Sequence, residues 1–303
     1  MTVSADTTPT VTAPGEALRQ LVGASRPLSW VNTAYPFAAA YLLAGGGVDA
    51  VLVVGTAYFL VPYNLLMYGV NDVFDYESDL RNPRKGGVEG VVLLDRWHRL
   101  TLWSAALSNL PFLVYLALAG NGWSSAALAV VVLAVVAYSA PGLRFKERPL
   151  LDSVTSSTHF VGPGLVGLAI SGHEVTGPAV VAFLAFFLWG AASQAFGAVQ
   201  DITADRSGGI GSVATWCGAA RTVRLALAAY ALSGALLLLG AGWPGRLAGL
   251  LVVPYLVNIW RYRNLDEAGC GRAHAGWRRF LVLNYVTGFL LTQLLIWCAL
   301  RGR

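Results

Sequence analysis

Long apolar runs alternate with short polar segments along almost the whole chain. The runs cover about residues 28–44, 50–70, 101–119, 123–140, 152–170, 178–198, 221–240, 246–262 and 279–300. Each has roughly 17 to 22 residues, which is enough to cross the hydrocarbon core of a membrane as an α-helix. The pattern therefore predicts an all-α membrane protein with nine transmembrane helices. A shorter amphipathic segment at residues 16–25 is expected to lie along the membrane surface.

The composition agrees with this interpretation. Of the 303 residues, 56% are hydrophobic and only 12% are charged, and the three cysteines form no paired or metal-binding spacing. The N-terminal segment has no basic residue before an apolar core, so it does not fit a signal peptide. We expect a disordered tail over residues 1–17 and a single transmembrane domain over residues 18–303.

The basic residues are distributed unevenly between the two sides of such a bundle. If the N-terminus is cytoplasmic, only Arg246, Arg301 and Arg303 of the 21 Lys and Arg residues fall on the outer side, and the other 18 fall inside. Retention of positive charge in the cytoplasm fixes the orientation of membrane proteins. We therefore expect a multi-pass plasma-membrane protein whose chemistry faces the cytoplasm. The net charge of +5 then requires no nucleic-acid partner.

An acidic segment, NDVFDYESD, covers residues 71–79, where the second apolar run ends. Asp75 and Asp79 are four residues apart and would share one face of a helix, whereas Asp72 would point away from that face. Carboxylates at this spacing suit Mg²⁺, which takes one or two of them together with phosphate oxygens and water. The segment therefore predicts a magnesium and diphosphate site at a membrane surface.

A second acidic pair repeats this spacing at the end of the sixth run. Asp201 and Asp205 lie in the segment QDITADRSGG. The two pairs together could hold two Mg²⁺ ions that bridge a prenyl diphosphate and neutralise it as the allylic carbon–oxygen bond ionises. The alternative is that these are solvated acids at helix ends, although an acid at a helix C-terminus opposes the helix dipole.

Basic residues follow the first acidic pair and occur again in the segment YSAPGLRFKERPLLDS. Arg84 and Lys85 come directly after the first pair and are well placed for a diphosphate. Arg144 and Lys146 alternate with apolar residues, so an extended loop would aim both cations at one ligand. Retention of positive charge in the cytoplasm explains the same two residues without a ligand.

Polar side chains near or inside the runs have two explanations each. Tyr138 is placed either to belong to an interfacial aromatic belt or to contact a substrate. His159 is the one buried candidate for proton handling, and the alternative is a structural histidine. The remaining polar residues are expected to form hydrogen bonds between helices. They include Asn32, Asn64, Asn109, Gln194, Asn258, Asn284 and Gln293.

The segments NDVFDYESD, DITAD and the intervening YSAPGLRFKERP resemble the UbiA superfamily of intramembrane prenyltransferases. The resemblance covers residues 20–303 and implies nine helices around a central apolar cavity, with Mg²⁺ and diphosphate beneath cytoplasmic loops. By motif position, the two acidic pairs look like metal ligands, and Arg26, Arg84 and Lys146 look like diphosphate contacts. The complete predicted set has Asp72, Asp75, Asp79, Asp201 and Asp205 as metal ligands and Asn71, Arg26, Arg84, Lys85, Tyr138, Arg144 and Lys146 as diphosphate contacts.

One departure from the family pattern concerns the acceptor. Members that prenylate aromatic acids usually carry an RTxxRP-like segment after the first motif, whereas this chain has LRNPRKGGVEG. That segment, with YNLLMYGVND before it, resembles the lycopene elongase branch. The implied function is magnesium-dependent transfer of a dimethylallyl group from its diphosphate to the ends of lycopene or a related carotenoid, ending in proton loss or hydration.

Two alternatives remain open at this point. The acceptor could instead be a quinone precursor or another isoprenoid lipid. A membrane transporter or cation-binding protein is a further alternative, but its acids should lie near the middle of the membrane at broken helices.

Overall fold

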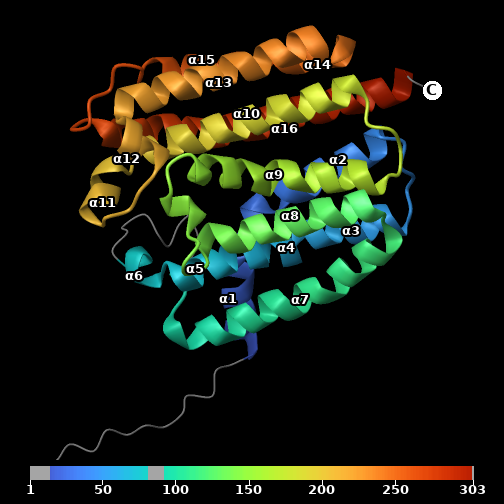
Figure 1. The fold of residues 1–303 in the computed structure, drawn as a ribbon, viewed down its shortest axis with the longest axis horizontal. Coiled ribbons are helices and arrows are strands. Elements are labelled where there is room, and N and C mark those ends of the chain that lie inside the picture. The colour runs from blue at the N-terminus through green and yellow to red at the C-terminus, as the bar shows by residue number, and fades with distance from the viewer. Residues whose placement is uncertain (1–13, 81–91, 302–303) are drawn as a thin grey trace, which may run out of the picture.

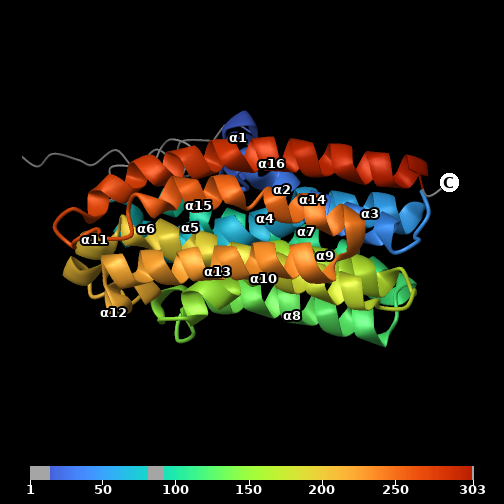
Figure 2. The same ribbon diagram turned by 90° about the horizontal axis from the view of Figure 1, so that it is seen from above.

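The structure, a computed structural model, describes residues 14–80 and 92–301. Throughout these two ranges it contains helices and turns but no β-strand, so the predicted all-α fold is confirmed. Most helices lie side by side along the long axis of one bundle, and the short α1 (Pro14–Ala24) is steeply inclined to them (Figures 1 and 2). Because α1 begins at Pro14, the last residues assigned to the N-terminal tail belong to this helix, and residues 1–13 lie outside the described part.

Six helical segments are long and apolar enough to cross a membrane. They are Ala50–Phe74, Asp95–Ala119, Gly122–Ser139, Gly177–Val199, Ala219–Gly240 and Cys270–Arg301. The first comprises α3 to α5, and the other five consist of or contain α7 (His98–Ala119), α8 (Gly122–Ser139), α10 (Gly177–Val199), α13 (Ala219–Gly240) and α16 (Ala273–Arg301). Two of these begin with a 3₁₀ turn, η3 (Asp95–Trp97) before α7 and η5 (Cys270–Arg272) before α16.

The other three apolar runs also form helices, which differ from these six in length or polarity. α2 (Trp30–Leu43) has only 14 residues. α9 (Leu151–Ile170) has 20 residues, but its first turns carry the polar sequence DSVTSSTH. The run over residues 246–262 is divided into α14 (Gly242–Leu250) and α15 (Val253–Trp260). Pro254 lies in the first turn of α15. The described chain thus has six candidate spans, and the count of nine stays a prediction.

The span Ala50–Phe74 is interrupted before it reaches the acidic motif. Its parts are α3 (Ala50–Leu60), α4 (Pro62–Asn64), the π-helical turn η2 (Leu65–Gly69) and α5 (Val70–Phe74). Pro62 causes the first break, because proline has no N–H group and its ring clashes with the preceding turn. π-helical turns frequently occur near functional sites.

Two buried asparagines satisfy the carbonyl groups around this break. The Asn64 Nδ2 group donates to the carbonyls of Phe59 at 2.8 Å and Leu60 at 3.1 Å. The Asn109 Nδ2 group, from α7, donates to the Pro62 carbonyl at 2.7 Å. Unpaired carbonyls inside a membrane cost several kcal/mol, so these bonds stabilise the irregular span. The predicted hydrogen-bonding role is confirmed at both positions.

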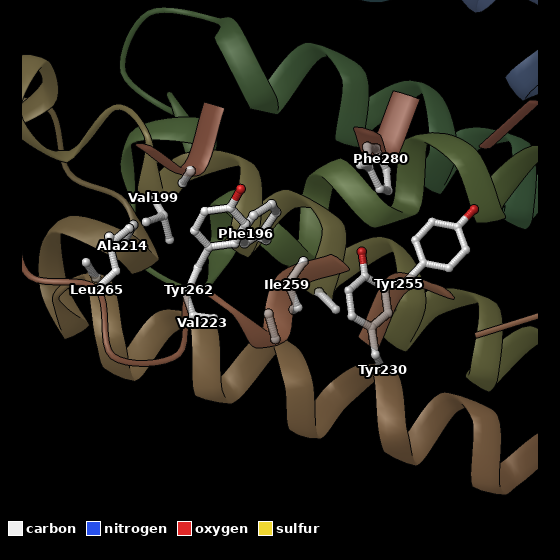
Figure 3. Close-up of a cluster of buried hydrophobic side chains, with 14 of the residues drawn as sticks. Phe196, Val199, Ala214, Val223, Tyr230, Tyr255, Ile259, Tyr262, Leu265 and Phe280 are labelled. Atoms are coloured by element: carbon white, nitrogen blue, oxygen red, sulfur yellow. The ribbon is translucent and has the colours of Figure 1, made fainter. Parts of the chain in front are cut away.

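Apolar side chains form two main buried clusters, one in each half of the bundle. The first is built from α10, α13, α15 and α16, and Figure 3 shows its aromatic members Phe196, Tyr230, Tyr255, Tyr262 and Phe280. The second is built mainly from α2, α3, α7, α8 and α9 and includes Phe37, Tyr58, Phe59, Tyr63 and Val131. Each half therefore has its own packed core.

Glycines let helices in the second half approach closely. A Cβ atom at Gly167 of α9 would lie 2.4 Å from the backbone oxygen of Phe37 in α2. A Cβ atom at Gly55 of α3 would lie 2.1 Å from the ring of the same Phe37. Small residues at helix contacts are typical of membrane proteins, where close van der Waals packing drives association.

The polar elements lie together at one end of the bundle. α5, α6 (Tyr76–Asp79), α11 (Ile202–Ser207) and α12 (Val213–Cys217) lie at this end in both views, and the C-terminal end of α16 lies at the other (Figures 1 and 2). The connection from α8 to α9, which contains η4 (Phe145–Glu147), also lies at the first end. The fold therefore brings both acidic motifs and the basic loop to the same end.

Candidate active site

The first acidic motif lies where the span Ala50–Phe74 gives way to α6. Asp75 has φ −102° and ψ 1°, and α6 begins at the next residue. The expectation of one continuous helix through Asp75 and Asp79 is therefore wrong, because the backbone leaves the helical conformation at Asp75. Asp79 belongs to α6, but its side chain lies outside the described residues, so the shared face stays a prediction.

The second acidic motif has the same backbone geometry. Asp201 lies between α10 and α11 with φ −100° and ψ −4°, close to the values at Asp75. This bridge region is sparsely populated and is common among active-site residues. The first aspartate of each pair, Asp75 or Asp201, thus lies between a long helical span and the short helix that follows it, α6 or α11.

The basic loop between α8 and α9 contacts the first motif. Lys146 forms an ion pair with Asp75 and also donates to Asn71 Oδ1 at 3.1 Å. The Arg144 Nη2 atom lies 3.4 Å from Asp75 Oδ1, although 69 residues separate the two in the chain. Ser139, at the end of α8, donates to the same Asn71 oxygen at 3.0 Å. Two predicted diphosphate contacts therefore lie directly against the first acidic motif.

Arg26 reaches the same motif from the N-terminal side. Its Nη2 atom lies 2.9 Å from Asp72 Oδ1, and its guanidinium group lies 4.3 Å from the centre of the Tyr68 ring. Asp72 is only 1% exposed, whereas the Arg26 side chain is 19% exposed, so the ion pair is partly buried. Asp72 therefore holds Arg26 beside the motif.

Two of these arginines have strained backbone conformations. Among the non-glycine residues that the structure describes, positive φ angles occur at Arg26 (52°), Arg144 (41°) and Leu150 (71°). A left-handed conformation costs a non-glycine residue about 1 kcal/mol or more and persists where surrounding contacts hold it. Both arginines are held by ion pairs to the first motif, and their strain marks this region as a candidate functional site.

Burial and neighbouring charges shift the pKa values of the loop residues. Burial lowers the pKa of Lys146 from its usual 10.5, and the Asp75 carboxylate opposes this shift. A hydrogen bond from Arg144 holds the pKa of Glu147 below its usual 4.5. An additional anion beside Lys146 would favour its charged form.

The second motif is held in place by contacts outside its own helix. Arg206 of α11 forms an ion pair with Glu267, with 3.0 Å from Nη2 to Oε1, and donates to the Thr215 carbonyl at 2.9 Å. Glu267 belongs to the connection before α16, and Thr215 belongs to α12. α11 is therefore tied to two neighbouring segments.

The described acidic residues have the oxygen donors that Mg²⁺ prefers, but they do not form a complete metal-binding cluster. Within residues 14–80 and 92–301, no three His, Cys, Asp or Glu side chains converge to hold a metal ion. Mg²⁺ usually keeps waters and binds one or two carboxylates together with substrate phosphate oxygens, so a site completed by the substrate needs no such cluster. The oxygen donors at the two motifs suit this mode.

Asp152 is a site residue that the sequence interpretation missed. Its carboxylate is buried at the start of α9 and accepts hydrogen bonds from the backbone N–H groups of Ser153 at 2.7 Å and Val213 at 2.8 Å. Val213 begins α12, directly after the second acidic segment. A Cβ atom at Gly211 would lie 2.6 Å from the Glu147 carbonyl, so the two connections also touch. Asp152 thus fastens the basic loop to the α11–α12 segment. Its position in the first turn of a predicted helix was the only sequence signal.

The side chains of Tyr138 and His159 are in contact. The two rings meet edge to face, with 4.9 Å between centroids, and Tyr138 directly precedes Ser139 in α8. Arg84 and Lys85 lie outside the described residues. Their predicted contacts with the diphosphate are therefore not tested.

The structure combines an apolar helical bundle with two acidic motifs and a basic loop at one end. This combination is typical of an intramembrane prenyltransferase, whose substrate has a diphosphate group and a hydrocarbon chain. The chain belongs to the UbiA prenyltransferase family, whose model matches residues 33–296. The predicted family and enzyme class are confirmed.

Named relatives cover nearly the whole chain. The C(50) beta-cyclic carotenoids biosynthesis protein LbtBC of Dietzia sp. is 56% identical over 283 residues, which are 93% of this chain and 66% of that protein. The chain therefore spans about two thirds of that relative's length. The lycopene elongase/hydratase of Corynebacterium glutamicum is 50% identical over 281 residues, which are 93% of this chain and 98% of that protein.

Solved structures share the fold. A UbiA homolog from Archaeoglobus fulgidus bound to DMAPP and Mg²⁺ has a TM-score of 0.63 and 19% sequence identity. The match covers 88% of this chain and 98% of that chain. At this identity the likeness concerns the fold alone.

Proposed function

We propose that this protein transfers a dimethylallyl group from its diphosphate to the ends of lycopene or a related carotenoid, with Mg²⁺ as cofactor. The observation that carries the proposal is the contact of the first acidic motif with Arg144 and Lys146 at one end of an apolar bundle. Support for the carotenoid acceptor comes from the names of relatives that are 50% and 56% identical.

In this proposal the basic residues change partners when the diphosphate binds. Lys146 and Arg144 now neutralise Asp75, and Arg26 neutralises Asp72. With the substrate present, these cations bind phosphate oxygens, as do the other predicted contacts Asn71, Arg84, Lys85 and Tyr138. The residues that would hold Mg²⁺ are Asp72, Asp75, Asp79, Asp201 and Asp205. Bound Mg²⁺ supplies charge neutralisation for the leaving diphosphate.

The chemistry is an electrophilic alkylation of a hydrocarbon. The carbon–oxygen bond of the donor breaks, diphosphate leaves, and a terminal double bond of the acceptor attacks the allylic cation. The resulting tertiary cation loses a proton or takes up water. A polyene has no carboxylate that needs a cation, so apolar surroundings suffice to bind it, and exclusion of water protects the allylic cation.

The topology belongs to the same proposal. The three less regular segments, α2, α9 and the α14–α15 pair, also cross the membrane, so that residues 18–303 form one domain with nine spans around an apolar cavity. The end with the acidic motifs faces the cytoplasm of the plasma membrane, as does the N-terminus. The distribution of the 21 Lys and Arg residues supports this orientation.

The test is a transferase assay with a double variant. Membranes that contain the protein, incubated with lycopene, dimethylallyl diphosphate and Mg²⁺, should add five-carbon units to the carotenoid, and chelation should stop the reaction. Asp75→Asn combined with Asp201→Asn should abolish the product while the protein remains folded. Asp266→Asn, at an exposed acid of the α15–α16 connection, is the matched control and should remain active.

Two outcomes would contradict the proposal. Full activity in the double variant would refute the metal ligands. Turnover of an aromatic acid with no elongated carotenoid would refute the acceptor, while the enzyme class would stand.

A further inference from the structure

We propose that His159 is the group that receives the proton at the end of the reaction, either from the carbon beside the tertiary cation or from the water that attacks it. The inference rests on the proposed carotenoid alkylation. It rests on two features of the described structure, namely the unpartnered ring nitrogen of His159 and the contact of its ring with Tyr138, next to a residue that binds the acidic motif.

The surroundings of His159 leave one ring nitrogen with an available lone pair. The side chain is buried, with His159 only 3% exposed, and Nε2 has no hydrogen-bond partner among the described residues. A neutral imidazole carries its hydrogen on one ring nitrogen and accepts a proton on the other, so Nε2 is the acceptor in the tautomer that has the hydrogen on Nδ1.

The ring is fixed rather than free to turn. Tyr138 meets it edge to face at an interplanar angle of 78°. The Tyr63 hydroxyl donates to the His159 backbone carbonyl at 3.2 Å and ties this turn of α9 to α4. A buried polar atom without a partner costs about 1 to 3 kcal/mol. Such an atom is retained where it has a partner in another state, and a reacting proton is such a partner.

His159 lies near the first acidic motif. Its ring contacts Tyr138, and the next residue, Ser139, donates to Asn71 Oδ1 of that motif at 3.0 Å. Along α9, His159 lies seven residues inward from Asp152, which is about 10 Å. The diphosphate would lie at the level of Asp75 and Lys146, and the reacting carbons lie a few bonds inward from it. In this proposal His159 lies inward from the diphosphate, on the side where the new carbon–carbon bond forms.

The step balances without a further reactant. The donor carbon–oxygen bond breaks, its electron pair leaves with diphosphate, and the acceptor double bond supplies the electrons of the new carbon–carbon bond. The adjacent C–H bond then gives its electrons to a new double bond, and the proton goes to Nε2. When water adds instead, its oxygen bonds to the cationic carbon, and the proton that it releases goes to the same nitrogen.

The experiment compares His159→Phe, which keeps the ring contact with Tyr138, with His159→Asn, which keeps a polar side chain but no base. Purified protein in lipid nanodiscs receives lycopene, dimethylallyl diphosphate and Mg²⁺. Diphosphate release and carotenoid products are measured together. Loss of a general base should lower elongated product formation about 10²-fold. The KM for dimethylallyl diphosphate should change by less than about twofold, since no contact with the diphosphate is removed.

The partition of products separates a base from a structural residue. In both variants, diphosphate release should exceed elongated product, and the excess should appear as dimethylallyl alcohol. Ser157→Ala is the matched control, because Ser157 lies on a different face of α9 and donates to the Phe187 carbonyl. Thermal unfolding checks that each protein is folded, and His159→Asn decides the question if His159→Phe is unstable.

The opposite results are equally clear. Wild-type rates and an unchanged ratio of alkene to alcohol in either folded variant would overturn the inference and assign the proton to diphosphate or bulk water. Absence of elongation in the unsubstituted protein would instead overturn the proposed function. Equal loss of diphosphate release and product in both variants would make His159 structural.

Discussion

Asp152→Ala should be one of the most damaging single substitutions at the site end of the bundle. The change removes a buried carboxylate that accepts hydrogen bonds from Ser153 and Val213 at 2.7 and 2.8 Å. Hydrogen bonds to a charged group contribute about 1.5 to 3 kcal/mol each. Part of this is offset because Ser153 lies in the first turn of α9, where water can reach an unpaired N–H group. We therefore expect a loss of about 3 to 5 kcal/mol in the free energy of unfolding.

The stability of Asp152→Asn should lie between that of Asp152→Ala and that of the wild type. Its amide oxygen can still accept one of the two N–H groups, so the loss should be about 1 to 3 kcal/mol. Denaturant titration of the purified protein in mixed micelles measures both values. Asp95→Ala is the control, because Asp95 also lies at a helix start but is 73% exposed, and it should cost less than about 0.5 kcal/mol.

Asp152→Ala should also weaken the binding of dimethylallyl diphosphate. Once α12 is released from α9, the loop with Lys146 is no longer fastened, so the KM for dimethylallyl diphosphate should rise more than kcat falls. An Asp152→Ala protein within about 0.5 kcal/mol of the wild type would refute the reasoning. So would a large loss of stability with an unchanged KM, since the loop would then be positioned by other contacts.

Two further predictions concern the basic loop. Lys146→Met should raise the KM for dimethylallyl diphosphate about 30-fold or more, because a buried cation beside the diphosphate contributes at least about 2 kcal/mol. Arg148→Met, at a neighbouring residue that donates to the Gly142 carbonyl, is its control, and equal effects of both changes would contradict the assignment. The stabilisation that Glu147 gives to the folded state should be lost in acid. The Arg144 hydrogen bond lowers its folded-state pKa below 4.5, so its stabilisation is complete above that pH and disappears as the pH falls through the folded-state pKa. Glu147→Gln should flatten the dependence of thermal stability on pH below about pH 4.5, and an unchanged profile would contradict this.

Some parts of the structure were predictable because they depend on local sequence. Each apolar run became helical, in one or more segments, close to its predicted bounds, since a span of that length must satisfy its own backbone hydrogen bonds inside a membrane. Asn64 and Asn109 form the hydrogen bonds expected of polar residues in such runs.

Other parts were wrong or out of reach. The helix break at Asp75 was missed because helical spacing alone does not reveal a change of ψ at one residue. The division of the run over residues 246–262 into α14 and α15 was also missed, although Pro254 marks it. Asp152 was overlooked because its role depends on Val213, which lies 61 residues away.

The sequence by itself determined the class of protein. The apolar runs, the two acidic pairs and the uneven distribution of basic residues among the connections are all local patterns, and each is typical of a chain in a membrane. These patterns define an intramembrane enzyme for diphosphates, and the segment after Asp79 favours a carotenoid acceptor.

Only the tertiary structure decided which charges meet. It placed Lys146 and Arg144 on Asp75, Arg26 on Asp72, and Asp152 between the basic loop and α12. The acidic segment NDVFDYESD is separated from its cations by tens of residues in either direction, and no periodicity records such a pairing. The helices meet by packing, and the packing of the whole bundle therefore determines the geometry of the site.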